Sequence, residues 1–268
     1  MSYLCFTIYF KALINAMSTL IRNFAHAMDE EILTNMGKVT FTKEEIIRRV
    51  AQVWAPLDQH EKDLLARNVT TKSLSRNEYV YQAGEISGYC YFLLSGKLKV
   101  CMEGSDGRNN ILRIIGPGEF VGIRAVFADE CYTTSAIALE SAVLAVFPKN
   151  IMLSMSLTCR SVGKYFLKLF SSLLGQAEQR TISLTHKHVR GRLAEALIAL
   201  KECYGEEAST HYLNVYLSRE DLASLSNMTT SNAIRTLSSF AEDGLVETEG
   251  KRIKIVREDE LREISRLG

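Results

Sequence analysis

The segment LSREDLASLSNMTTSNAIRTLSSFAEDGLVETEGKRIKIV, residues 217–256, decides the fold of the C-terminal part of the chain. Apolar residues recur at helical spacing on both sides of Asn227, a residue type that tolerates the left-handed backbone of a sharp turn. Ser218, with Asp221 three residues later, forms a capping box, and Thr229 can cap a second helix. The segment therefore predicts two short helices joined by a tight turn, the arrangement that places a second helix in the DNA major groove.

The second predicted helix has one apolar and one polar side. Ala233, Ile234 and Leu237 are expected on the buried side. On the other side lie Ser231, Arg235 and Ser238, where they would meet base edges.

A small hairpin is predicted after Gly244. Two alternating runs, residues 245–248 and 252–256, flank Glu249-Gly250, which is a turn signal. The basic residues beside this turn form a wing that would contact phosphate: Lys251, Arg252, Lys254 and Arg257. An ordinary packed α+β subdomain remains the alternative to a DNA-binding unit.

Charge alone does not identify a DNA-binding protein here. From residue 185 to the end, twelve Lys or Arg stand against fourteen Asp or Glu. Because nonspecific affinity depends on neutralised phosphates, we expect weak nonspecific binding and a dependence on dimerisation and base contacts.

Length and composition indicate an ordinary globular protein. The 268 residues, 47% of them hydrophobic and with a net charge of +1, suffice for two domains. Six dispersed cysteines without a C-x-x-C pair predict reduced thiols and a cytoplasmic location. His186 and His188 are expected on different faces near a helix boundary, so neither a metal site nor a cofactor is predicted.

Residues 1–40 form an N-terminal extension. Residues 1–21 are apolar, but Lys11 interrupts them and the uninterrupted stretches are too short to cross a bilayer, so no membrane role is expected. Two readings stay open: a helix that packs on a neighbour, or a true start at Met17 or Met28.

Residues 41–158 are predicted to form a β-roll with leading helices. Thr42 and Glu45 form a capping box, Phe41 and Ile46 a hydrophobic staple, and the first helix runs to about Trp54. Pro56 follows, and Asp58 begins a second helix. Short strands then alternate with glycine turns at Gly84, Gly96, Gly107 and Gly118. The predicted strands are residues 79–81, 91–94, 98–101, 111–115, 120–121, 135–138 and 143–147, a spacing typical of a roll or barrel.

Residues 159–186 contain a long helix. Val162, Phe166, Leu169 and Leu173 recur at 4-3-4 spacing, which predicts a coiled-coil dimer interface, although packing on the chain's own β-domain would give the same stripe. Residues 187–268 begin with a helix over 189–203 that buries Leu193, Leu197 and Leu200. A strand over residues 212–217 is expected to lead into the helix pair.

The chain resembles the Crp/Fnr family of bacterial transcription regulators over about residues 45–260. The resemblance is carried by Gly84-Glu85, by YFLLSGKLKV at residues 91–100, by GPGEFVG at 116–122, by GRLA at 191–194 and by the helix pair. It implies an α+β fold with an N-terminal jelly-roll-like β-roll sensor domain, a long dimerisation helix and a C-terminal winged helix-turn-helix domain. It also implies a homodimer, palindromic promoter DNA and RNA polymerase as partners, an effector in the roll, and no enzyme activity.

The chain departs from the cyclic-nucleotide sensors of that family. Where those proteins hold the ribose with Glu and the cyclic phosphate with Arg-Ser or Arg-Thr, this sequence has Ile123 and Thr133-Thr134. The residues matching the adenine contacts are Ala177 and Glu178. We therefore expect an effector other than cyclic AMP, or none, in a pocket formed by Gly122, Ile123, Arg124, Thr133 and Thr134.

The resemblance also implies other possible sensing chemistries and functions. The iron–sulfur branch of the family needs a cluster of N-terminal cysteines, which Cys5 alone cannot supply. Three alternatives remain: a haem sensor, a small-molecule module with altered DNA specificity, and a true cyclic-nucleotide regulator. Arg124 could face an anion or form a surface salt bridge.

On the recognition helix, Thr230, Ser231 and Arg235 match the family's base-reading positions, and of these Arg235 retains the family's residue. An Arg can bind guanine O6 and N7 through two hydrogen bonds, whereas Thr and Ser discriminate weakly. The half-site is therefore expected to depart from the TGTGA-like family pattern. The predicted DNA contacts are Ser218, Arg219, Thr229, Thr230, Ser231, Asn232, Arg235, Lys251 and Arg252.

Overall fold

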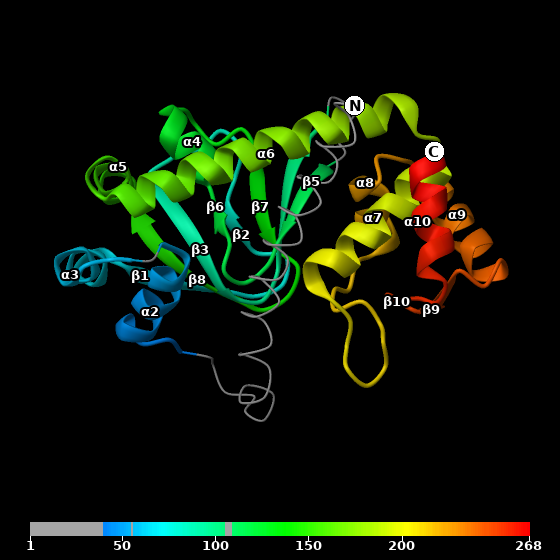
Figure 1. Ribbon diagram of the computed structural model, residues 1–268, viewed down its shortest axis with the longest axis horizontal. Coiled ribbons are helices and arrows are strands. Elements are labelled where there is room, and N and C mark those ends of the chain that lie inside the picture. The colour runs from blue at the N-terminus through cyan, green and yellow to red at the C-terminus, as the bar shows by residue number, and fades with distance from the viewer. Residues whose placement is uncertain (1–39, 55, 105–108) are drawn as a thin grey trace, which may run out of the picture.

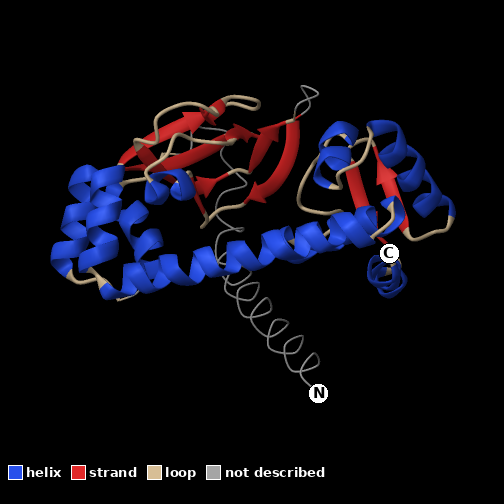
Figure 2. Cartoon of the chain, turned by 90° about the horizontal axis from the view of Figure 1, so that it is seen from above, coloured by secondary structure: helices blue, strands red, loops and turns tan. Residues whose placement is uncertain are grey.

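The computed structural model describes residues 40–54, 56–104 and 109–268. A β-domain lies alongside most of one long helix, and a smaller, mainly helical C-terminal domain follows at the C-terminal end of that helix (Figures 1 and 2). The predicted α+β architecture is confirmed. The predictions for residues 1–21, Met17, Met28 and Gly107 lie outside the described residues.

Two helices precede the β-domain, α2 (Lys43–Trp54) and α3 (Gln59–Asn68). Thr42 Oγ1 accepts the Glu45 amide at 3.2 Å, as predicted, while the Glu45 carboxylate pairs with Arg49 at 3.1 Å. A capping box between Asp58 and Glu61 begins α3. Both predicted helix starts are therefore confirmed.

The β-domain consists of two four-stranded antiparallel sheets, ordered β1-β8-β3-β6 and β2-β7-β4-β5. All seven predicted strands are present. The polar first strand, β1, lacks the apolar alternation that signals a strand and was not predicted as a separate element, although it pairs with β8 along its length. The bounds are β1 (Thr70–Leu74), β2 (Tyr79–Tyr81), β3 (Tyr89–Ser95), β4 (Leu98–Glu103), β5 (Asn109–Ile115), β6 (Phe120–Val121), β7 (Ser135–Ala138) and β8 (Ala142–Pro148).

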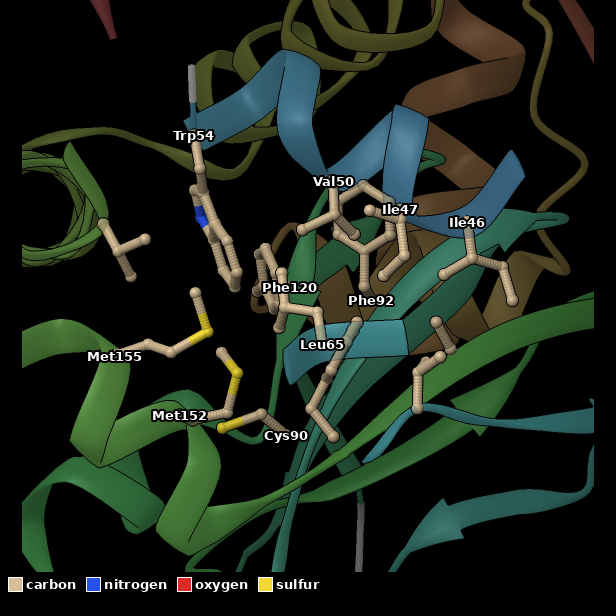
Figure 3. Close-up of a cluster of buried hydrophobic side chains, with 14 of the residues drawn as sticks. Ile46, Ile47, Val50, Trp54, Leu65, Cys90, Phe92, Phe120, Met152 and Met155 are labelled. Carbon is tan, nitrogen blue, oxygen red and sulfur yellow. The ribbon is translucent and has the colours of Figure 1, made fainter. Parts of the chain in front are cut away.

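An aromatic and aliphatic core joins the helices to this roll (Figure 3). Trp54 stacks on Phe120 with ring centroids 5.1 Å apart, and Phe120 contacts Phe92 at 4.8 Å. Two helices that the sequence did not predict also pack here, α4 (Ile123–Ala128) and α5 (Lys149–Thr158). They close the roll against the long helix.

The long helix, α6 (Arg160–His186), uses its predicted apolar stripe differently from the expected dimer interface. Val162 and Phe166 are buried in the β-domain core of their own chain, and Leu169 and Leu173 pack partly buried against the same cluster. The stripe predicted as the dimer interface therefore serves packing within the chain, the alternative left open by the sequence.

The C-terminal domain contains α7 (Val189–Tyr204), α8 (Arg219–Leu225), α9 (Thr230–Glu242), the hairpin β9 (Val246–Glu249) and β10 (Arg252–Ile255), and a further helix, α10 (Glu258–Leu267). Leu193, Leu197 and Leu200 are buried, as predicted. The predicted strand over residues 212–217 is wrong, because this extended segment forms no ladder beyond a bridge between Glu206 and Leu213.

The unpredicted α10 packs tightly on α7. A Cβ at Gly191 would lie 2.7 Å from the backbone carbon of Gly268, so this close approach requires glycine. Among the described helices, none is long and apolar enough to cross a membrane.

Candidate nucleic-acid interface and effector region

The helix pair is built by three local signals. Ser218 Oγ accepts the Asp221 amide at 3.0 Å and completes the capping box that begins α8. Asn227 takes a left-handed φ of 49° in the turn. Thr229 Oγ1 then accepts the Asn232 amide at 3.2 Å and begins α9. All three features are as predicted.

One face of α9 is buried and the other is exposed. Ala233, Leu237 and Phe240 are buried, while Ser231, Arg235 and Ser238 are exposed, as predicted. The prediction for Ile234 is wrong, because its side chain is 47% exposed. It stands one residue, or about 100°, around the helix from Ala233, which turns it out of the buried row.

Few cations at this surface are free. Arg235 and Lys251 are exposed and make no hydrogen bond or ion pair with any described residue. Three other basic side chains of the wing already have acidic partners in the chain: Arg252 with Glu207 at 2.6 Å, Lys254 with Glu247 at 3.0 Å, and Arg257 with Glu260 at 2.9 Å. The predicted basic cluster is therefore largely neutralised. Of its four side chains, Lys251 is the one that could contact a phosphate without first breaking an ion pair.

The hairpin is held against the first helix of the pair. Arg252 pairs with Glu249, so the turn is Gly250-Lys251, one residue later than predicted, and Gly250 has a φ of 56°. Arg219 Nη2 donates to the Gly250 carbonyl at 2.8 Å. Ser218, Arg219 and Arg252 thus make contacts within the chain, whereas Thr230, Ser231 and Arg235 point outward. Asn232, beside them, is partly exposed.

The structure brings the predicted effector residues together around the start of α4. Gly122, with a φ of 82°, precedes α4, and Ile123 is buried in the aromatic core. Arg124 pairs with Glu130 at 2.9 Å and donates to Thr133 Oγ1 at 2.9 Å. The guanidinium is therefore engaged in a surface salt bridge, the second of the two roles weighed for it.

Three tyrosines that the sequence did not single out fill the interior beside these residues. Tyr81 stacks on Tyr132 with centroids 4.0 Å apart and lies 5.9 Å from Tyr91. Tyr132 Oη donates to the Tyr89 carbonyl at 2.6 Å. Burial raises the pKa of Tyr81 to about 12, even though Thr134 forms a hydrogen bond with it. Thr134 therefore contacts this tyrosine group.

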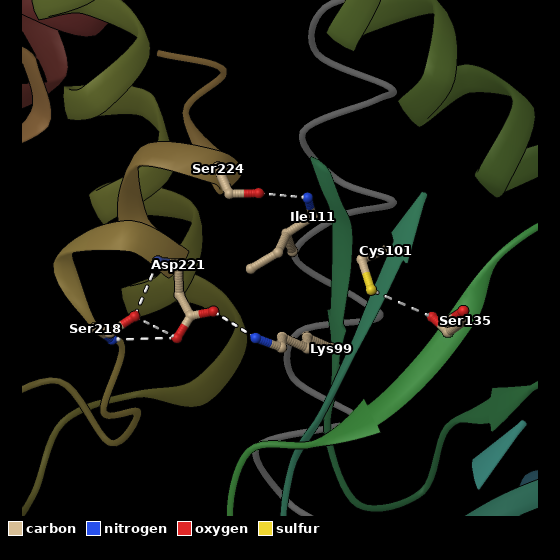
Figure 4. A network of polar contacts seen from close by, with 7 residues as sticks. All are labelled: Lys99, Cys101, Ile111, Ser135, Ser218, Asp221 and Ser224. Carbon is tan, nitrogen blue, oxygen red and sulfur yellow. Dashed lines mark hydrogen bonds and ion pairs between the residues drawn. The ribbon is translucent and has the colours of Figure 1, made fainter. Parts of the chain in front are cut away.

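The β-domain and the helix pair are joined by polar contacts (Figure 4). Lys99 Nζ of β4 lies 2.6 Å from Asp221 Oδ1 of α8, with the two side chains 19% and 12% exposed. The Ile111 amide of β5 donates to Ser224 Oγ at 2.7 Å. From α6, Arg180 donates to the carbonyls of Ile111 and Leu112 at 2.8 and 2.9 Å. The first helix of the pair is therefore docked on the β4–β5 hairpin.

The docked arrangement favours the charged form of Asp221. Burial alone would raise its pKa, but hydrogen bonds from Lys99 and Ser218 outweigh burial and leave the pKa below its ordinary value. A carboxyl whose pKa is depressed stabilises the folded arrangement above its unfolded pKa, and this stabilisation is lost as the pH falls through the depressed value.

Replacing Lys99 by Met is expected to loosen the docked helix, because it leaves a largely buried carboxylate without its countercharge. Hydrogen exchange at the Ile111 amide should accelerate in the variant. In the unmodified protein, exchange corrected for its intrinsic pH dependence should accelerate as the pH falls through the depressed pKa of Asp221. Lys97→Met is the matched control, since Lys97 pairs with Glu140 within the β-domain. Equal exchange in both variants would show that Lys99 does not hold α8.

No cluster of three or more His, Cys, Asp or Glu suited to a metal ion occurs within residues 40–54, 56–104 and 109–268. His186 is the last residue of α6 and His188 the N-cap of α7, so the two belong to different helices.

Comparisons with known proteins agree on both halves of the chain. A family model described as cyclic nucleotide-binding domain matches residues 71–158, and one described as Crp-like helix-turn-helix domain matches residues 191–264, together more than half of the chain. The CRP-like cAMP-activated global transcriptional regulator of Mycobacterium tuberculosis is 24% identical over 213 residues, covering 79% of this chain and 95% of that protein. The anaerobic regulatory protein of Bacillus subtilis is 27% identical over 203 residues, covering 75% and 85%.

Solved structures show the same fold. FixK2 from Bradyrhizobium japonicum superposes with a TM-score of 0.66 at 20% identity, covering 73% of this chain and 96% of that one. The global regulator CLP of Xanthomonas campestris, described as responsive to c-di-GMP, gives a TM-score of 0.65 at 20% identity, covering 74% and 99%.

Proposed function

Because the chain belongs to the Crp/Fnr family of transcription regulators, we propose that it binds promoter DNA as a homodimer and does not use cyclic AMP as its effector. The observation that carries DNA binding is Arg235, an exposed arginine without a partner among the described residues, on the outward face of a capped helix. A guanidinium in that position can bind guanine O6 and N7 in the major groove.

Selection of binding sites from random double-stranded oligonucleotides tests this function. Enrichment of a two-fold symmetric site is expected, with half-sites one helical turn apart, about 34–36 Å centre to centre. A selection that enriches no sequence above the starting pool would contradict it.

A second copy of the chain is proposed to pack along α6, on a stripe different from the one that the sequence predicted. Leu167 and Leu174 are 72% and 63% exposed, although both are large and apolar. They belong to a 3-4-3-4-3 series on α6 that begins at Leu167 and ends at Leu184, the spacing of a coiled-coil seam. The series is Leu167, Phe170, Leu174, Ala177, Thr181 and Leu184, of which Phe170 also packs against the β-domain core.

The effector proposal rests on what occupies the predicted anchors. Ile123 cannot accept a ribose hydrogen bond and is 2% exposed, and the guanidinium of Arg124 is paired with Glu130. A cyclic phosphate placed beside Thr133 would therefore find no free countercharge from these residues.

Neither cyclic AMP nor cyclic GMP is expected to bind at micromolar concentrations, because these replacements remove both the ribose and the phosphate anchor. Isothermal titration calorimetry on the full chain checks this, with Arg124→Ala as the companion variant. Micromolar binding by the unmodified protein would overturn the prediction, and its loss in Arg124→Ala would identify Arg124 as a phosphate anchor.

A further inference from the structure

Ile234 stands out among the apolar residues of α9. The apolar residues on the inner side of this helix, Ala233, Leu237 and Phe240, are at most 3% exposed, whereas Ile234 is 47% exposed. About half of the Ile234 side chain is therefore accessible to a molecule that covers this face of α9, and burying it there would be favourable.

The neighbours of Ile234 identify that face. Thr230 and Ser238 lie four residues before and after it, and Ser231 lies three residues before it, so all three adjoin it on the helix surface. Each is exposed and polar, and Arg235 follows directly in the sequence. Ile234 is therefore an apolar spot within the surface proposed to enter the major groove.

In the major groove, the C5-methyl group of thymine is the feature of a base pair that an aliphatic side chain can recognise. We propose that Ile234 contacts a thymine methyl in each half-site, next to the guanine read by Arg235, and thereby sets specificity at that base pair. This inference rests on the proposed DNA binding and adds a second base-reading residue to it. The contact buries methyl groups of both partners and requires no hydrogen bond.

Deoxyuridine provides a direct test, because it pairs like thymidine and lacks the methyl group alone. Each thymine of the selected half-site is replaced in turn, and dissociation constants are measured for the full chain and for Ile234→Ala. At one position per half-site, the unmodified protein should lose about fourfold in affinity, the effect of exposing one methyl-sized group. Ile234→Ala should bind the thymine and uracil forms of that site equally.

Two further variants sharpen the result. Arg235→Ala should keep the uracil penalty while losing preference for guanine, and Ile234→Val should keep part of the penalty. Because Ile234 is half exposed, its replacement is expected to change the melting temperature little. Measuring the melting temperature checks that the variant is folded.

The outcomes separate this inference from the proposed function. Two outcomes would overturn the role of Ile234 and leave DNA binding intact. In the first, uracil in place of any thymine of the defined site leaves the affinity unchanged; in the second, the loss caused by uracil persists in Ile234→Ala. A selection without any enriched site would overturn the proposed function, and this inference with it.

Discussion

Arg235→Ala is expected to cost about 1–3 kcal/mol of binding free energy at each half-site and to abolish the preference for one guanine. The reason is geometric: Arg235 is exposed on α9, has no partner among the described residues, and can place two N–H groups on one guanine edge. With two half-sites, the loss in binding free energy for the selected operator is the sum of the losses at the two contacts. Site selection and equilibrium binding at two salt concentrations measure both effects.

Lys251→Ala is the matched control. Lys251 is exposed at the tip of the hairpin and is likewise unpaired within the described part of the chain. Its loss should weaken all sequences alike and flatten the dependence of affinity on salt, because a phosphate contact carries no sequence information. If Arg235→Ala also weakened all sequences alike, Arg235 would be a phosphate contact and not a base-reading residue.

Leu174→Lys is expected to convert the proposed dimer to monomers and to lower affinity for a two-half-site operator far more than for a single half-site. Leu174 is 63% exposed at the centre of the proposed seam on α6, where a partner helix would have to bury the introduced ammonium group. Light scattering and sedimentation equilibrium at matched concentrations measure the change in mass.

Gln179→Lys introduces the same charge on α6 at an exposed position outside the seam and should remain dimeric. Leu169→Lys is less informative, because Leu169 packs against the chain's own β-domain core and its replacement would also destabilise the fold. A full dimer in Leu174→Lys would place the subunit interface elsewhere on the chain.

Local sequence signals were sufficient wherever the structure depends on neighbouring residues. Ser218 with Asp221, Asn227 and Thr229 each predict a cap or a turn within a few residues, and each occurs as expected. The apolar strands of the roll were equally accessible, because alternation and glycine turns define them locally.

What the sequence did not reveal depends on contacts between distant residues. Lys99 and Asp221 lie 122 positions apart, and nothing in either neighbourhood links them. The helical stripe of Val162 and Phe166 fits two partners equally well, and packing on the β-domain is what the structure shows. Sequence reasoning places Ile234 wrongly because apolar character does not by itself establish burial, and this side chain is 47% exposed.

The unbroken course of α6 has a mechanical consequence. Its 27 residues begin in the β-domain core, and Ser183 near its other end donates to Glu195 of the C-terminal domain. At 1.5 Å per residue the helix is about 40 Å long, so a tilt of about 5° at one end displaces the other by about 3.5 Å. That displacement equals roughly the 3.4 Å rise between successive base pairs. Under the proposed function, a change in the β-domain that tilts α6 by this much and releases the contacts of Arg180 and Ser224 with β5 would move α9 by about one base pair.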